Sequence, residues 1–196
     1  MIIIGVLLGC LIGSLPTADW LARSRGVDLR ATGTGNPGTN NALRVGGPKL
    51  AVPVLLAEFA KGAAAVWVGH FFGDAAGASL AGIVATAANV YNPWFGFRGG
   101  KGLAITGGTL TVAAPWVFLV LVAVIGLGVA VMRRSGPAAL VTFASYIAVA
   151  AWGGLDGGLV SEAPWLVAMA VGQSALMAPK HVLDTLRPAD RSASRG

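Results

Sequence analysis

Long stretches almost without charged residues alternate with short polar segments along the chain. These stretches cover residues 1–18, 50–73, 75–97, 102–132, 135–155 and 163–179. Only the second contains charges, those of Glu58 and Lys61. A helix needs roughly 17 to 25 apolar residues to cross a bilayer, and every stretch reaches that length. The pattern therefore predicts an all-α fold, a polytopic transmembrane helix bundle.

The stretch 102–132 is too long for a single span. As one helix, its 31 residues would extend roughly 46 Å, well beyond a hydrocarbon core of ~30 Å. Pro115 and the pair Gly107-Gly108 are natural breaks. Dividing the stretch at Pro115 also places every loop Lys and Arg on one side of the membrane, as the positive-inside rule requires. We therefore predict seven helices with a short fourth, an external N-terminus and a cytoplasmic C-terminus.

Composition narrows the possible function classes. Hydrophobic residues make up 55% of the 196 residues and charged residues only 11%, whereas a soluble domain carries about 25% charged residues. A soluble enzyme is therefore all but excluded. The net charge of +6 is not arranged as a basic, aromatic-rich soluble face, so we expect no nucleic-acid partner. The sequence shows no cluster of metal ligands and no cofactor motif, so we expect neither a metal nor a cofactor.

The first predicted cytoplasmic loop is rich in glycine, threonine and asparagine. Gly33, Gly35 and Gly38 match the G-x-G-x-x-G spacing, but no strand precedes them, so a dinucleotide fold is not indicated. Glycines do let a backbone approach a ligand closely, and successive N–H groups can form an anion nest. Arg44 follows and offers a bidentate guanidinium suited to phosphate. A flexible polar loop explains the segment about equally well.

The second predicted cytoplasmic loop is a stronger candidate for anion binding than the first. It reads Phe97-Arg98-Gly99-Gly100-Lys101-Gly102 and precedes a predicted helix. It is not a P-loop, because Gly102 stands where that motif has Ser or Thr. Free backbone N–H groups, a helix start and the Lys101 charge nevertheless meet at one point, which favours anion binding. The alternative is a positively charged membrane anchor with a glycine turn.

Two further features involve ionisable residues in or near the spans. Glu58 and Lys61 lie one helical turn apart within a span, and mutual neutralisation is the favoured interpretation. His181 lies just beyond the last span, with Asp184 and Arg187 at helical spacing from it. A lone interfacial histidine is usually structural, and a catalytic role is the less common alternative.

Several short motifs occur in a fixed order along the chain. They are Gly13-Ser14-Leu15-Pro16, residues 33–41 with the following Arg44, Glu58-Phe59-Ala60-Lys61-Gly62, and Phe97-Arg98-Gly99-Gly100-Lys101-Gly102-Leu103-Ala104. In order, spacing and total length they resemble the bacterial acyl-phosphate:glycerol-3-phosphate acyltransferases. The resemblance covers nearly the whole chain, which is identified as a divergent member of that family.

The chain departs from the family pattern at several positions. Thr34 replaces a serine but keeps the hydroxyl, and Asn89 stands where the family has a histidine. The family's third motif survives only as His181, Asp184 in place of asparagine, and Arg187. These changes leave open a catalytically degenerate homologue that binds phosphate or phospholipid without turnover. An anion transporter fits less well, because its polar groups should lie near the bilayer midplane.

The resemblance implies transfer of a fatty acyl group from acyl-phosphate to the 1-hydroxyl of glycerol 3-phosphate, giving lysophosphatidic acid and phosphate. The partners would be these two substrates and membrane lipid. The implied catalytic residues are Thr34, Arg44, Lys101 and His181. The implied substrate-binding residues are Ser14, Gly35, Asn36, Gly38, Asn41, Gly99, Gly100 and Gly102. Backbone N–H groups of the last three would seat glycerol 3-phosphate.

The expected organisation is one integral membrane domain, residues 1–185, followed by a disordered basic cytoplasmic tail, residues 186–196. The resemblance places this domain in the bacterial cytoplasmic membrane as a multi-pass protein. Its active site would face the cytoplasm, where both glycine-rich loops are predicted to lie.

Overall fold

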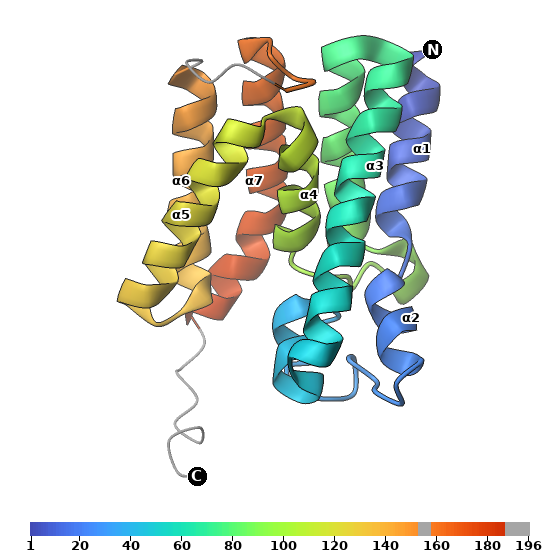
Figure 1. The fold of residues 1–196 in the computed structure, drawn as a ribbon, viewed down its shortest axis with the longest axis vertical. Coiled ribbons are helices and arrows are strands. Elements are labelled where there is room, and N and C mark those ends of the chain that lie inside the picture. Colours follow the sequence, from blue (N-terminus) through green and yellow to red (C-terminus); the bar gives the residue numbers. More distant parts are fainter. Residues whose placement is uncertain (153–157, 187–196) are drawn as a thin grey trace.

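The computed structural model describes residues 1–152 and 158–186, and every regular element in these ranges is helical. The helices are α1 (Ile2–Ser14), α2 (Thr17–Arg23), α3 (Thr39–Val90), α4 (Leu103–Ala113), α5 (Pro115–Met132), α6 (Ser135–Trp152) and α7 (Ala163–Leu186). A short 3-10 turn, η1 (Pro93–Phe95), precedes α4. Most of the helices stand side by side with their long axes roughly aligned (Figure 1). The predicted all-α bundle is confirmed.

Helix α3 is not one continuous rod. Its backbone leaves helical geometry at Gly47, where φ is 63°, and again at Gly73 and Asp74. At the second break the chain turns back. Helix α3 therefore has a first limb, before Gly73, and a second limb, after Asp74, and the two limbs lie side by side (Figure 1). The limbs touch closely, because a Cβ on Gly69 would lie 2.3 Å from the carbonyl oxygen of Gly77. The two stretches predicted on either side of Asp74 therefore form one helical hairpin.

The long fourth stretch divides into two helices, as predicted, and the division falls at Ala114. With 11 residues, α4 is about 16 Å long, roughly half the thickness of a hydrocarbon core. The backbone N–H groups of Leu159 and Val160 donate to the carbonyls of Val112 and Ala113, at 3.1 and 3.0 Å. The segment before α7 thus satisfies carbonyls at the end of α4 that have no partner within the helix.

A buried glutamine joins four helices in the middle of the bundle. The amide nitrogen of Gln173 in α7 lies 3.2 Å from the carbonyl oxygen of Gly82 and 3.0 Å from the hydroxyls of Thr86 and Thr109. Tyr146 in α6 donates its hydroxyl to Gln173 Oε1 at 3.1 Å. These contacts satisfy polar groups away from water and fix α4, α6 and α7 against the second limb of α3.

Most of the polar segments lie toward one end of the bundle. The segment α2, the start of α3, the α5–α6 turn and the C-terminal end of α7 lie toward the lower end in Figure 1, and the N-terminus lies at the opposite end. Within the described ranges, five segments are long and apolar enough to cross a membrane, one of them holding both limbs of α3, and α4 is shorter. The count of seven spans and their orientation stay predictions. Arg187 and the predicted tail beyond it lie outside the described residues.

Candidate active site

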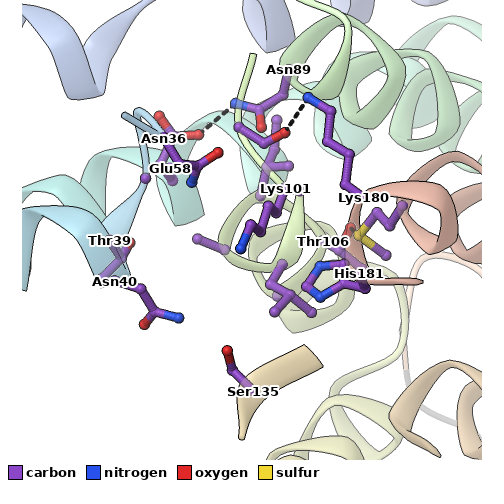
Figure 2. Close-up of a pocket in the computed structure, with 18 of the residues that line it drawn as sticks. Asn36, Thr39, Asn40, Glu58, Asn89, Lys101, Thr106, Ser135, Lys180 and His181 are labelled. Carbon is purple, nitrogen blue, oxygen red and sulfur yellow. Dashed lines mark hydrogen bonds between the residues drawn. The ribbon is translucent and has the colours of Figure 1, made fainter. Parts of the chain in front are cut away.

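A cavity of about 1350 Å³ lies between the two glycine-rich loops and helices α3 to α7. All but one of the twelve site residues that the sequence predicts line this cavity. Figure 2 shows Lys101 near its centre, with Asn36 and Asn40 on one side and Lys180 and His181 on the other. The fold therefore brings together two loops that are separated by the whole of α3.

The cavity has a polar end and an apolar end. The polar end is formed by loop residues 30–44 and 97–102. The apolar end lies between α4, α5 and α6, and its lining includes Leu110, Phe118, Leu121, Val122, Ile125 and Phe143. Tyr146 also lines the apolar end and bonds to Gln173 through its hydroxyl. One cavity thus combines a charged compartment with a compartment suited to a hydrocarbon chain.

The first loop is braced from within by Asn41, which is buried. Its Oδ1 accepts a hydrogen bond from the Thr34 N–H at 2.7 Å, and its Nδ2 donates to the carbonyls of Leu29 and Thr32 at 2.8 and 3.0 Å. A Cβ on Gly33, where φ is 62°, would lie 2.2 Å from Asn41 Oδ1. Asn41 and Gly33 therefore give this loop a defined backbone path, and anion binding by the loop stays a prediction. Because both amide hydrogens of Asn41 are used inside the loop, they are not free for the predicted contact with substrate.

Replacing Asn41 by alanine is expected to lower the free energy of unfolding by about 2 kcal/mol, because it removes the partners of three backbone groups. Equilibrium unfolding of the purified protein in detergent measures this change. Asn40→Ala is the matched control, since Asn40 is exposed, and its effect is expected to stay within about 0.5 kcal/mol. Equal effects of the two substitutions would contradict the bracing role of Asn41.

The second loop runs against the end of α3. The N–H groups of Gly99 and Gly100 donate to the carbonyls of Val90 and Asn89, both at 3.1 Å. The approach is so close that a Cβ on Gly99 would lie 1.9 Å from the Asn89 oxygen. The expectation that these two N–H groups seat a ligand is therefore corrected, because both are used inside the protein. At Gly102, where φ is 87°, the chain enters α4, and the first turn of this helix lines the cavity.

Two lysines hold the second loop in different ways. Lys101 forms an ion pair with Asp184 of α7, and the side chains are 28% and 21% exposed. Lys180 donates from its ammonium group to the carbonyls of Val90, Gly99 and Gly100 at 2.6, 2.8 and 2.9 Å. Lys180 therefore clamps the loop to α7, whereas Lys101 extends into the cavity (Figure 2).

His181 lines the cavity although its residue is only 1% exposed. Its ring packs edge-to-face on Phe143, with 5.3 Å between centroids. Neither ring nitrogen has a geometric hydrogen-bond partner among the described residues, although the ring lies beside the backbone of Lys101. The imidazole thus combines a packing contact with two buried ring nitrogens in the wall of the cavity.

The intramembrane pair Glu58 and Lys61 is neutralised internally, as predicted, by an ion pair of 2.9 Å. Glu58 also accepts hydrogen bonds from Thr17 at 2.8 Å and Asn89 at 2.7 Å. Lys61 donates to the Leu15 carbonyl at 2.8 Å. The pair thereby joins the α1–α2 junction to both limbs of α3, next to the cavity that Glu58 lines.

Ser14 is the predicted site residue that does not line the cavity. It is buried, and its hydroxyl donates to the Leu11 carbonyl and accepts from Trp94 Nε1, at 2.8 and 3.2 Å. Its carbonyl accepts from Asn92 Nδ2 at 2.7 Å. These contacts hold η1 against the end of α1, so the predicted substrate contact of Ser14 stays a prediction.

Several residues that line the cavity were not predicted from the sequence, namely Arg30, Arg98, Asn89 and Lys180. Arg30 stacks over the Phe95 ring at 4.2 Å and donates to the Arg98 carbonyl at 3.0 Å. Its backbone N–H donates to Asp28 Oδ1, which lowers the pKa of the Asp28 carboxyl and fixes the preceding turn. Two of these four residues could have been predicted, because Arg98 and Lys180 are direct neighbours of the predicted site residues Gly99 and His181.

The family model described as glycerol-3-phosphate acyltransferase matches residues 3–187, nearly the whole chain. The chain belongs to this family. The resemblance inferred from the motifs is confirmed, and the two loops that carry most of those motifs are the ones that form the polar end of the cavity.

Relatives that carry the name glycerol-3-phosphate acyltransferase are similar over part of their length. The one from Rhizobium etli is 44% identical over 129 residues, which cover 65% of this chain and 62% of the relative. The one from Coxiella burnetii is 41% identical over 143 residues, covering 71% of this chain and 74% of the relative. The chain thus matches less than two thirds of the length of the Rhizobium etli protein.

The fold is similar to crystal structures of PlsY (YgiH), an integral membrane glycerol 3-phosphate acyltransferase. The glycerol 3-phosphate form has a TM-score of 0.81 at 27% identity and covers 94% of this chain and 90% of that chain. The lysophosphatidic acid form has a TM-score of 0.81 at 26% identity, covering 94% and 89%. Together with the long apolar helices, this similarity shows a multi-pass integral membrane protein.

Proposed function

We propose that the chain is an acyl-phosphate-dependent glycerol-3-phosphate acyltransferase. It transfers a fatty acyl group from acyl-phosphate to the 1-hydroxyl of glycerol 3-phosphate and releases lysophosphatidic acid and phosphate. The observation that carries the proposal is the joined cavity, whose cationic polar end suits two phosphate-bearing substrates and whose apolar end suits an acyl chain. The names of the relatives and of the similar structures support the same reaction class.

The two loops supply the groups that bind the acyl-phosphate. Arg44 is exposed, lines the cavity and offers a bidentate guanidinium, whereas Lys101 brings a point charge from the other loop. The Thr34 hydroxyl lies on the same loop wall as Arg44. These three groups stabilise the negative charge that develops on the carbonyl oxygen and on the departing phosphate.

Glycerol 3-phosphate is assigned to the first turn of α4 and the facing loop. The first N–H groups of a helix have no partner within it, and the first turn from Gly102 onward lines the cavity. Gly35, Asn36 and Gly38 line the opposite wall and supply further polar contacts. The substrate phosphate would lie between these two walls.

The reaction requires one proton transfer. The 1-hydroxyl oxygen bonds to the acyl carbonyl carbon, the bond from that carbon to the phosphate oxygen breaks, and the hydroxyl proton leaves with the phosphate. His181 is the side chain that we assign to accept this proton first or to orient the phosphate, because it lines the cavity and its ring nitrogens have no geometric hydrogen-bond partner among the described residues. The departing phosphate oxygen is itself a sufficient acceptor.

We place this site on the cytoplasmic side of the bacterial cytoplasmic membrane. Arg23, Arg25, Arg133 and Arg134 all belong to segments toward the lower end of the bundle in Figure 1. Such a bias of loop cations is typical of the cytoplasmic side. Substrate made in the cytoplasm would then reach the polar end directly.

The proposal is tested by incubating purified protein with labelled glycerol 3-phosphate and either acyl-phosphate or acyl-CoA. Lysophosphatidic acid is expected with acyl-phosphate and not with acyl-CoA. Formation from acyl-CoA alone would reject the assigned donor. Substrate binding without product from either donor would instead support a catalytically degenerate lipid-binding homologue.

A further inference from the structure

The cavity carries an excess of positive charge. Its described lining includes five cationic side chains, Arg30, Arg44, Arg98, Lys101 and Lys180, and two carboxylates, Glu58 and Asp184. Such an excess suits ligands that bring phosphate groups. The carboxylates are the unexpected members of the lining, because each opposes the binding of an anion.

The two carboxylates have different partners. Glu58 is buried and neutralised by Lys61, so it contributes little net charge to the cavity. Asp184 is instead paired with Lys101, the cation near the centre of the cavity. Both members of this pair are partly exposed to the cavity. The Asp184 carboxylate therefore binds the Lys101 ammonium group, to which an anionic ligand in the cavity would also bind.

The backbone of Asp184 is held separately from its side chain. Arg134 donates to the carbonyls of Asp184 and Thr185, at 3.2 and 2.9 Å. These bonds tie α7 to the start of α6 whatever the rotamer of the Asp184 side chain. Release of Lys101 by Asp184 then requires a side-chain rotation and no movement of the helix.

We propose that Asp184 determines ligand specificity by competing with the substrate phosphate for Lys101. This inference rests on the proposed function, because it assumes that Lys101 binds a substrate phosphate. A phosphate group brings up to two negative charges and three acceptor oxygens, so it displaces the single charge of Asp184. A monocarboxylate, such as a free fatty acid, brings no more charge than Asp184 and does not displace it. Asp184 returns to Lys101 when the phosphate leaves.

Asp184→Asn tests this competition, because it removes the charge and keeps the shape. We expect this variant to bind inorganic phosphate about tenfold more tightly than the unmodified protein. Calorimetry with phosphate and the purified full chain in detergent measures the Kd. Glu162→Gln is the matched control, since Glu162 is exposed and does not line the cavity. Its phosphate Kd is expected to be unchanged.

Selectivity provides a second measurement. Octanoate is expected to compete with phosphate in Asp184→Asn and not in the unmodified protein, because the internal carboxylate no longer occupies Lys101. In a Lys101→Gln background, Asp184→Asn is expected to change the phosphate Kd by less than about twofold, because Asp184 acts through Lys101. A general loss of structure would weaken phosphate binding and would not produce this pattern.

Unchanged or weaker phosphate binding by Asp184→Asn, with a thermal midpoint equal to that of the unmodified protein, overturns the inference. Lost turnover at unchanged phosphate affinity also overturns it and shows that Asp184 acts in the reaction step and not in phosphate binding. If Asp184→Asn does not fold, Asp184→Ser removes the same charge and carries the same expectation. Calorimetry needs no turnover, so an inactive protein with the expected shift rejects the proposed function alone. An active protein without the shift rejects this inference alone.

Discussion

Replacing Lys101 by alanine is expected to lower kcat/KM for lysophosphatidic acid formation by roughly 10²- to 10³-fold. Lys101 extends into the middle of the cavity from the second loop (Figure 2). Without it, the negative charge that develops in the transition state loses its central donor, and water replaces that donor poorly in a preorganised site. Initial rates with acyl-phosphate and labelled glycerol 3-phosphate measure the loss.

The matched control for this experiment is Lys49→Ala. Lys49 is an exposed lysine of α3 that does not line the cavity, so its removal lowers the net charge equally. We expect its kcat/KM to stay within about twofold of the unmodified value. Full activity of Lys101→Ala would show that the assignment of the second loop is wrong.

Replacing Gly99 by alanine is expected to lower kcat/KM by about 10²-fold, because a displacement of about 1 Å in an active site has a cost of that order. The added Cβ would lie 1.9 Å from the Asn89 carbonyl oxygen and 2.9 Å from the Asn92 side chain. The loop must therefore move away from α3, and Lys101 moves with it. This movement would also stretch the hydrogen bond that Lys180 donates to the Gly99 carbonyl.

Activity and the thermal midpoint should both fall in Gly99→Ala. Gly126→Ala is the comparison, since a Cβ at this exposed position of α5 meets nothing within 4 Å. Alanine there is expected to leave activity unchanged and to stabilise the helix by up to about 1 kcal/mol. Equal activities of the two variants would show that the close approach of Gly99 to α3 does not position the loop.

The helical architecture was largely predictable because it depends on local sequence. The charge-poor stretches marked the long helices, and the placement of Lys and Arg together with Pro115 indicated that the fourth stretch divides. The structure places that division at Ala114. The chain reversal at Gly73 and Asp74 likewise follows from an interruption that the sequence shows directly.

The partners within the site could not be predicted in the same way. Lys101 and Asp184 are far apart in the sequence, and their contact depends on how α7 packs beside α4. The role of Gly99 was also difficult to predict. Gly99 was interpreted as a place for a ligand to approach, whereas the structure uses it for the approach of the Asn89 carbonyl. Sequence alone does not distinguish these two reasons for a glycine.

The shortness of α4 has an electrostatic consequence. Aligned peptide dipoles leave partial positive charge at the start of a helix and partial negative charge at its end. In α4 the negative pole is covered by the N–H groups of Leu159 and Val160, and the positive pole borders the cavity beside Lys101. The packed interior of the bundle screens such a field far less than water does. The start of this half-length helix therefore adds a positive potential to that of Lys101 at the same wall of the cavity.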